Sequence, residues 1–189
     1  MLVKTVSPPQ ITCDDLEEKW AISDSRHRFW LRRGPQDYKK YTPNDQPKRL
    51  LFVMLNPSTA DASIDDPTIR RCRQLAFDNG YGVFGVVNLF SFRATSPDDL
   101  IAAEYPNDEK SDDAIISALA WADEVCFAFG VERKGLKGRD TWKERVAWVA
   151  DQTTKAGMTP KALGTTKDGW PRHPLYLKSD SKLQPWLPR

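Results

Sequence analysis

Three short apolar runs constrain the fold of this chain more than any other feature. They read "LLFVML" at 50 to 55, "VFGVVNLF" at 83 to 90 and "EVCFAFG" at 124 to 130. None of them alternates apolar and polar residues, as a strand with one wet face would, so helices are expected to cover both faces of each run. The three runs are therefore expected to be adjacent parallel strands at the centre of one sheet.

Helical patterns lie between the runs. Asp66 followed by Pro67 favours a helix start, because an Asp side chain caps free N–H groups and Pro fits the first turn. Ile69, Cys72 and Ala76 then recur at helical spacing. Further helices are expected across 107 to 122 and after the basic loop "VERKGLKGRD".

Two more segments complete the expected sheet. "RHRFWLRRG" at 26 to 34 alternates moderately, which is typical of an edge strand, and "KALG" at 161 to 164 is a candidate fourth parallel strand. The order of strands and helices predicts an α/β fold, a three-layer α/β/α sandwich with a central, mostly parallel sheet and an extra N-terminal edge strand.

Length and composition set the wider frame. A chain of 189 residues fits one domain, which we place at 26–189, with residues 1–25 as an N-terminal arm because they show no clear period. The net charge of +2 neither identifies nor excludes an acidic partner. Three widely spaced cysteines form neither a disulfide framework nor a CxxC zinc site. The cysteine usage and the lack of a signal-like or membrane-spanning run lead us to expect a cytoplasmic protein without a membrane partner. We also expect a monomer.

Polar residues follow each expected strand, and the carboxyl ends of parallel strands share one rim where ligands bind. Asn56 could orient a water there, although Asn-Pro-Ser is also common turn chemistry. Asn88 interrupts an apolar strand, and a buried amide needs a protein or ligand partner. Its donor and acceptor suit the edge of a base. His173, in "WPRHPLYL", follows the last strand and is a candidate catalytic group. We expect Asn56, Asn88 and His173 to line one pocket.

The acidic loop leaves two interpretations open. Asp61, Asp65 and Asp66 could bind Mg²⁺, with Arg70 and Arg71 clamping phosphate. Alternatively, Asp66 caps a helix and one arginine pairs with Asp65 to hold the loop. Because no second acidic cluster follows another strand, we expect no metal and no cofactor.

Several motifs together point to a family. "RFWLRR", "MLNPSTAD", "DDPTIRRC", "VVNLFSFRAT" and "HPLYL" resemble the uncharacterised bacterial and phage domain-of-unknown-function family 1643, across roughly residues 26 to 178. The order of polar strand ends also resembles the uracil-DNA glycosylase superfamily, more distantly. That resemblance implies that Asn56-Pro57 places a water, Asn88 reads a flipped base, Gly130 closes the third strand, and His173-Pro174 precedes a Leu175 wedge.

The resemblance implies a DNA glycosylase-like hydrolase that cleaves the N-glycosidic bond of a modified, deaminated or mismatched base, with DNA as its partner. A metal-dependent nuclease or nucleotide hydrolase, and a non-catalytic nucleotide or modified-base binder, remain as alternatives. Asn56 and His173 would be catalytic. The expected substrate-binding residues are Pro57, Ser58, Thr59, Asp61, Asp65, Arg70, Arg71, Asn88, Arg93, Gly130, Leu175 and Tyr176, and the expected contacts to the nucleic-acid backbone are Lys134, Lys137 and Arg139.

Overall fold

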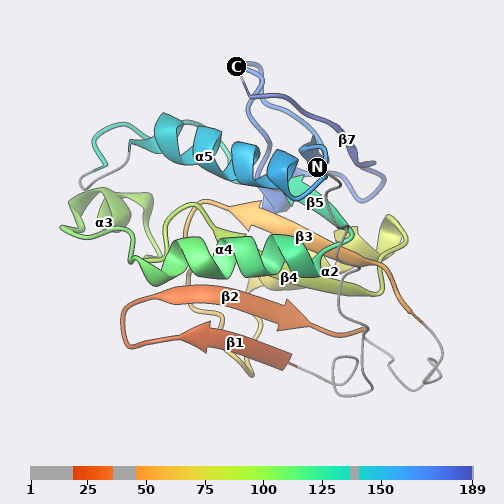
Figure 1. Ribbon diagram of the computed structural model, residues 1–189, viewed down its shortest axis with the longest axis horizontal. Coiled ribbons are helices and arrows are strands. Elements are labelled where there is room, and N and C mark those ends of the chain that lie inside the picture. The colour runs from red at the N-terminus through yellow and green to blue at the C-terminus, as the bar shows by residue number, and fades with distance from the viewer. Residues whose placement is uncertain (1–18, 36–45, 137–140, 189) are drawn as a thin grey trace, which may run out of the picture.

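The computed structural model describes residues 19–35, 46–136 and 141–188, which form an α/β fold around one sheet (Figure 1). The sheet has seven strands in the order β1-β2-β4-β3-β5-β6-β7. The strands are β1 Lys19–Ser23, β2 Arg28–Arg33, β3 Arg49–Met54, β4 Val83–Asn88, β5 Glu124–Phe127, β6 Lys161–Ala162 and β7 Gln184–Pro185. The helices are α2 Pro67–Asp78, α3 Pro97–Ala102, α4 Lys110–Trp121 and α5 Trp142–Lys155, with a short 3₁₀ turn, η2, at Pro174–Tyr176.

The three apolar runs form the centre of the sheet, as predicted. β3 pairs in parallel with β4 on one side and with β5 on the other, so that Leu51 lies opposite both Gly85 and Val125. β6 continues the parallel set beyond β5. These strands deliver their carboxyl ends to a common rim.

The outer strands correct the prediction in two respects. β2 is antiparallel to β4, β1 is antiparallel to β2, and β7 is antiparallel to β6, so the sheet is mixed. β1 lies within the segment assigned to the arm, and β2 is therefore an inner strand, not an edge strand. The moderate alternation of this segment predicted an edge strand, but Arg28 and Arg33 are 2% and 0% exposed and are bound by the loop that follows β3.

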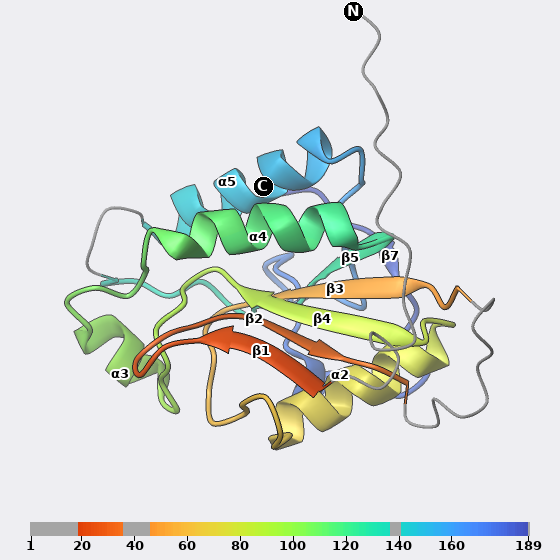
Figure 2. The same cartoon turned by 60° about the horizontal axis from the view of Figure 1, so that its bottom comes forward.

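Helices cover both faces of the sheet (Figure 2). Successive strand residues point to opposite faces, so Leu51, Val53 and Val87 pack with α4 and α5, whereas Leu50, Phe52 and Phe84 pack with α2. This division explains why the central strands show no polar alternation. In the described part of the chain, no helix has the length and apolar character needed to cross a membrane.

The predicted start of α2 is confirmed at atomic detail. The Asp66 side chain accepts a hydrogen bond of 2.8 Å from the Ile69 N–H, and Pro67 is the first helical residue. α4 begins at Lys110, slightly later than expected, and α3 was not predicted. The cap on α2 fixes the first turn of this helix beside the ends of the central strands.

Candidate functional site

A pocket of about 470 Å³ lies at the carboxyl ends of the parallel strands. Asn56 follows β3, Asn88 ends β4, Gly130 follows β5, and His173 precedes η2; all four line this pocket. The prediction that Asn56, Asn88 and His173 line one pocket is confirmed, although 117 positions separate the first from the last. Ser58, Leu175 and Tyr176, also expected at the site, line it as well.

Asn88 is the most unusual lining residue. Its side chain is 3% exposed, and neither the amide nitrogen nor the amide oxygen has a hydrogen-bond partner among the described residues. A buried polar group left unpaired costs about 1–3 kcal/mol. Because Asn88 lines the pocket, a bound ligand can supply both missing hydrogen bonds.

Asn56 is oriented by its own amide hydrogens. Nδ2 donates to the carbonyl oxygens of Pro57 at 3.0 Å and Ala94 at 2.8 Å. An amide has two donor hydrogens and one acceptor oxygen, and no described residue donates to Oδ1. The group that Asn56 offers to a ligand or a water is therefore an acceptor.

His173 offers the opposite polarity. Its Nδ1 accepts a long hydrogen bond of 3.4 Å from the Leu175 N–H, which in the neutral imidazole leaves the proton on Nε2. Burial lowers the pKa of His173, and the nearby charge of Asp66 opposes this shift only in part. At neutral pH the imidazole is therefore neutral, with Nε2–H as a donor.

Three arginines in the pocket wall, Arg28, Arg133 and Arg172, were not predicted. Arg28 enters from the amino end of β2 and donates from Nη1 to the Ala60 carbonyl at 2.9 Å. Burial lowers the pKa of Arg28 to about 10, with a smaller effect from the Arg93 charge, so Arg28 stays cationic at neutral pH. Asp66 is the one carboxylate among the lining residues, and the pocket is therefore positively charged.

The acidic loop after β3 is held by ion pairs. Asp65 lies between Arg33 at 2.6 Å and Arg73 at 2.7 Å, and Asp61 accepts hydrogen bonds from backbone N–H groups of its own loop. Burial opposes ionisation of Asp65, but the two arginines outweigh it and lower the pKa of this carboxyl. Asp61 is thus bound by its own loop, and Asp65 is bound by arginines of β2 and α2.

The arginines expected around this loop are also occupied by protein groups. The partners of the Asp65 carboxylate are Arg33 and Arg73, not Arg70 or Arg71 as expected, since Arg70 donates to the Asp65 carbonyl and Arg71 to the Leu177 carbonyl. Their side chains therefore hold the chain in place. The expected substrate-binding residues that do not line the pocket are Pro57, Thr59, Asp61, Asp65, Arg70, Arg71 and Arg93.

The three expected nucleic-acid contacts follow β5 in the sequence. Lys134 is exposed, whereas Lys137 and Arg139 lie outside the described residues. Leu175 and Tyr176, which are 48% and 75% exposed, stand at the mouth of the pocket. Exposed apolar tips beside a pocket are suited to contact a base or its neighbour.

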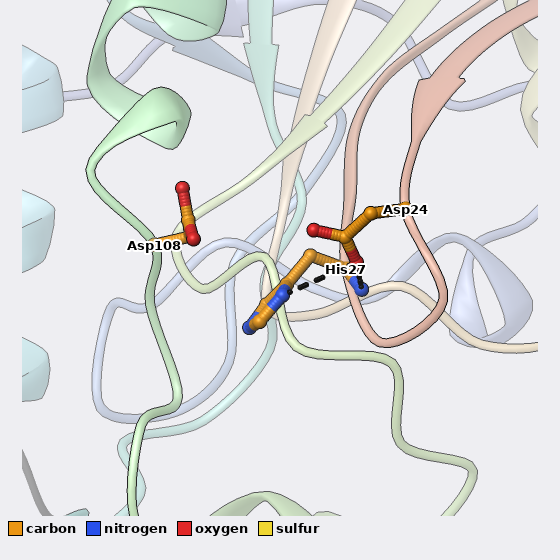
Figure 3. A group of neighbouring side chains, drawn as sticks. All are labelled: Asp24, His27 and Asp108. Atoms are coloured by element: carbon orange, nitrogen blue, oxygen red, sulfur yellow. Dashed lines mark hydrogen bonds and ion pairs between the residues drawn. The ribbon is translucent and has the colours of Figure 1, made fainter.

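Among the described residues, one group has the composition and spacing of a metal site. Ligand atoms of Asp24, His27 and Asp108 lie within 4.8 Å of one another (Figure 3). Asp24 Oδ1 already accepts from the backbone N–H groups of Arg26 and His27, at 2.8 and 2.7 Å, and lies 3.4 Å from His27 Nδ1. These contacts lie within the β1–β2 turn, and none of the three residues lines the pocket.

The sequence matches the family described as a protein of unknown function (DUF1643) over residues 28–175. This range contains every described pocket residue except Tyr176. No curated protein and no solved structure matches the chain.

Proposed function

We propose a function for this chain, which belongs to the DUF1643 family. The description of that family assigns no activity, so the pocket is the basis of the proposal. The protein is a DNA glycosylase-like hydrolase that cleaves the N-glycosidic bond of a modified, deaminated or mismatched base. The main support is the buried, unpaired amide of Asn88 in a pocket that it shares with Asn56 and His173.

Asn88 is suited to read a base edge. Its amide presents one acceptor and a pair of donor hydrogens side by side, which complements the alternating donors and acceptors of a nucleobase. Both groups are buried and unpaired, so a base that matches them gains two hydrogen bonds, while a base that does not match leaves the buried amide unpaired. This difference in binding free energy would make the pocket selective for a base that matches the amide.

Asn56 and His173 supply the polarities that hydrolysis requires. The Asn56 Oδ1 acceptor can hold a water through one of its hydrogens, so that the water oxygen faces the anomeric carbon. As the C–N bond breaks, its electron pair moves onto the base, and the Nε2–H of His173 can donate to the base oxygen where negative charge develops. The water oxygen joins the sugar, and the water proton passes to the released base or to solvent.

The likeness to uracil-DNA glycosylases belongs to this proposal. It is supported by the order of polar groups along the strand ends, Asn56, Asn88, Gly130 and His173, and by helices on both faces of the sheet. A three-layer glycosylase-like sandwich with DNA as partner is the architecture that this order suggests. The exposed Leu175 would then fill the stack that the flipped base leaves.

The alternatives use different residues. A metal-dependent nuclease would need Asp61, Asp65 and Asp66 as ligands. These carboxylates already accept from the loop backbone, from Arg33 and Arg73, and from the Ile69 N–H, respectively. A non-catalytic binder would use the same pocket and differs only in the absence of turnover. The binder is therefore the second candidate, because Asn56 orients a water but cannot remove its proton.

The test is the incubation of DNA and RNA that contain uracil, mismatches and phage-type modified bases, with released base measured by mass spectrometry. We expect base release that persists in chelator and falls about 100-fold or more in Asn56→Ala. Gln74→Ala, which removes an exposed amide from α2, is the matched control and should retain full activity.

Two results would reject the glycosylase. Ligand-induced stabilisation without release of any base would favour the binder. Release of nucleotides that chelator abolishes would favour the metal-dependent hydrolase.

A further inference from the structure

Two guanidinium groups share a single neutral acceptor beside the pocket. Nη1 of Arg28 and Nη1 of Arg93 lie 2.9 and 3.4 Å from the carbonyl oxygen of Ala60. The Nε atoms of both side chains are buried and have no hydrogen-bond partner among the described residues. Two cations held this close without a paired carboxylate repel each other, which is why the Arg93 charge adds to the effect of burial in lowering the pKa of Arg28.

The wall of the pocket contains further positive charge. Arg133 and Arg172 join Arg28 in the wall, and Arg133 Nε is also buried without a partner in the described part of the chain. Ion pairs within 4.0 Å are absent for all three of these arginines among the described residues. Asp66 is the one opposing charge in the wall, and it already caps α2. The wall of the pocket therefore has an excess of positive charge, which a bound anion would balance.

We infer that the pocket contains a phosphate subsite built around Arg28, with Arg133 and Arg172, and that its ligand is a nucleoside phosphate. The base of the ligand faces Asn88 and its phosphate faces the arginines, whose planar forks match phosphate oxygens. A volume of about 470 Å³ falls in the range of roughly 300–1,000 Å³ that holds whole small ligands. The identity of the base end rests on the proposed function, whereas the phosphate subsite does not.

A phosphate ester can come from a free nucleotide or from a nucleic-acid strand. The test therefore compares four probes by isothermal titration calorimetry on the full chain: inorganic phosphate, deoxyuridine, deoxyuridine 5′-monophosphate and a single-stranded oligonucleotide that contains uracil. We expect the monophosphate or the oligonucleotide to bind at least about tenfold more tightly than the nucleoside, with a preference that weakens as salt is raised. Preference for the monophosphate indicates a free nucleotide, and preference for the oligonucleotide alone indicates a strand.

Charge variants make the test specific. Arg28→Gln and Arg172→Ala should reduce the preference for phosphate to about twofold or less. Arg172 is exposed, so Arg172→Ala decides the matter if Arg28→Gln does not fold. Asp66→Asn, which keeps a capping side chain, should act in the opposite direction and tighten phosphate binding. Lys155→Ala removes an exposed cation from the end of α5 and should change nothing.

The outcomes separate this inference from the proposed function. Equal affinity for nucleoside and nucleoside phosphate, or a preference that survives in both arginine variants, would overturn the phosphate subsite even if base release is observed. A phosphate preference that depends on the arginines, without base release from any substrate, would support the subsite and reject the glycosylase.

Discussion

Replacement of Asn88 by leucine should make the protein more stable and inactive. Asn88→Leu substitutes an apolar side chain of similar length for an amide that is 3% exposed and has no partner among the described residues. The change removes the cost of an unpaired buried group, and it also removes the group proposed to read the base. Stability and function should therefore move in opposite directions.

Two contributions set the change in the free energy of unfolding of Asn88→Leu. Loss of the unpaired amide is worth about 1–3 kcal/mol, and the branched leucine loses part of that gain by crowding Met54, which pairs with position 88 across the sheet. A net gain of about 1–2 kcal/mol remains. For a domain of this size each kcal/mol shifts the melting temperature by about 2–4 °C, so the expected rise is about 2–8 °C.

Thermal unfolding and urea titration without ligand measure the gain, and the base-release assay measures the loss. Asn79→Leu is the matched control, because the amide of Asn79 is fully used: Nδ2 donates to the carbonyls of Leu75 and Ser181, and Oδ1 accepts from the Leu183 N–H. That variant should lose stability. A destabilised Asn88→Leu protein would show that the amide is satisfied within the folded chain, and it would refute the argument that a ligand completes it.

Three further predictions concern other parts of the structure. Asp65→Ala should lower the free energy of unfolding by about 3–5 kcal/mol in urea at pH 7, because the fully buried Arg33 loses its carboxylate partner. The pKa of Asp65 is lowered from 3.8 in the folded protein, so the stabilisation by this carboxylate is complete above pH 3.8 and is lost as the pH falls through the lower folded pKa. Below that folded pKa, variant and wild type should have the same stability. Base release should show an acid limb below pH 6.5, because burial lowers the pKa of His173 and the neutral imidazole is the donor; this limb should disappear in His173→Gln, and an unchanged limb would contradict the assignment. Gly85→Ala should lower stability by about 1–3 kcal/mol in thermal unfolding, because a Cβ at this position lies 3.0 Å from Trp121 Cζ3, and an unchanged melting temperature would contradict the close packing.

Local patterns were sufficient to predict the centre of the fold. The apolar runs of β3, β4 and β5 and the Asp66-Pro67 start of α2 depend on neighbouring residues alone, so the sequence contains the whole signal. The position of β2 was not predictable in this way. The arginines of β2 would be expected at the surface from the sequence alone. Arg33 is buried because it binds Asp65, which lies 32 residues later in the chain.

The site residues that were predicted depend on local patterns, whereas those that were missed depend on contacts between distant parts of the chain. Asn56 and Asn88 follow parallel strands, and the rule that such ends share a rim placed them together. Arg28 reaches the rim from the start of a strand, which the rule does not consider. Because β2 is antiparallel to β4, the amino end of β2 lies beside the carboxyl end of β4, where the Arg28 N–H donates to the Ser91 carbonyl at 3.0 Å.

The mixed sheet thus explains why one pocket contains both neutral amides and a buried cation. Parallel strands supply Asn56 and Asn88, neutral amides whose polarity suits a base and a water. The antiparallel strand supplies Arg28, a buried cation that suits a phosphate. A purely parallel sheet would bring only carboxyl ends to this rim, so the reversal at β2 is the step of the fold that joins the proposed base-reading and phosphate-binding groups in one pocket.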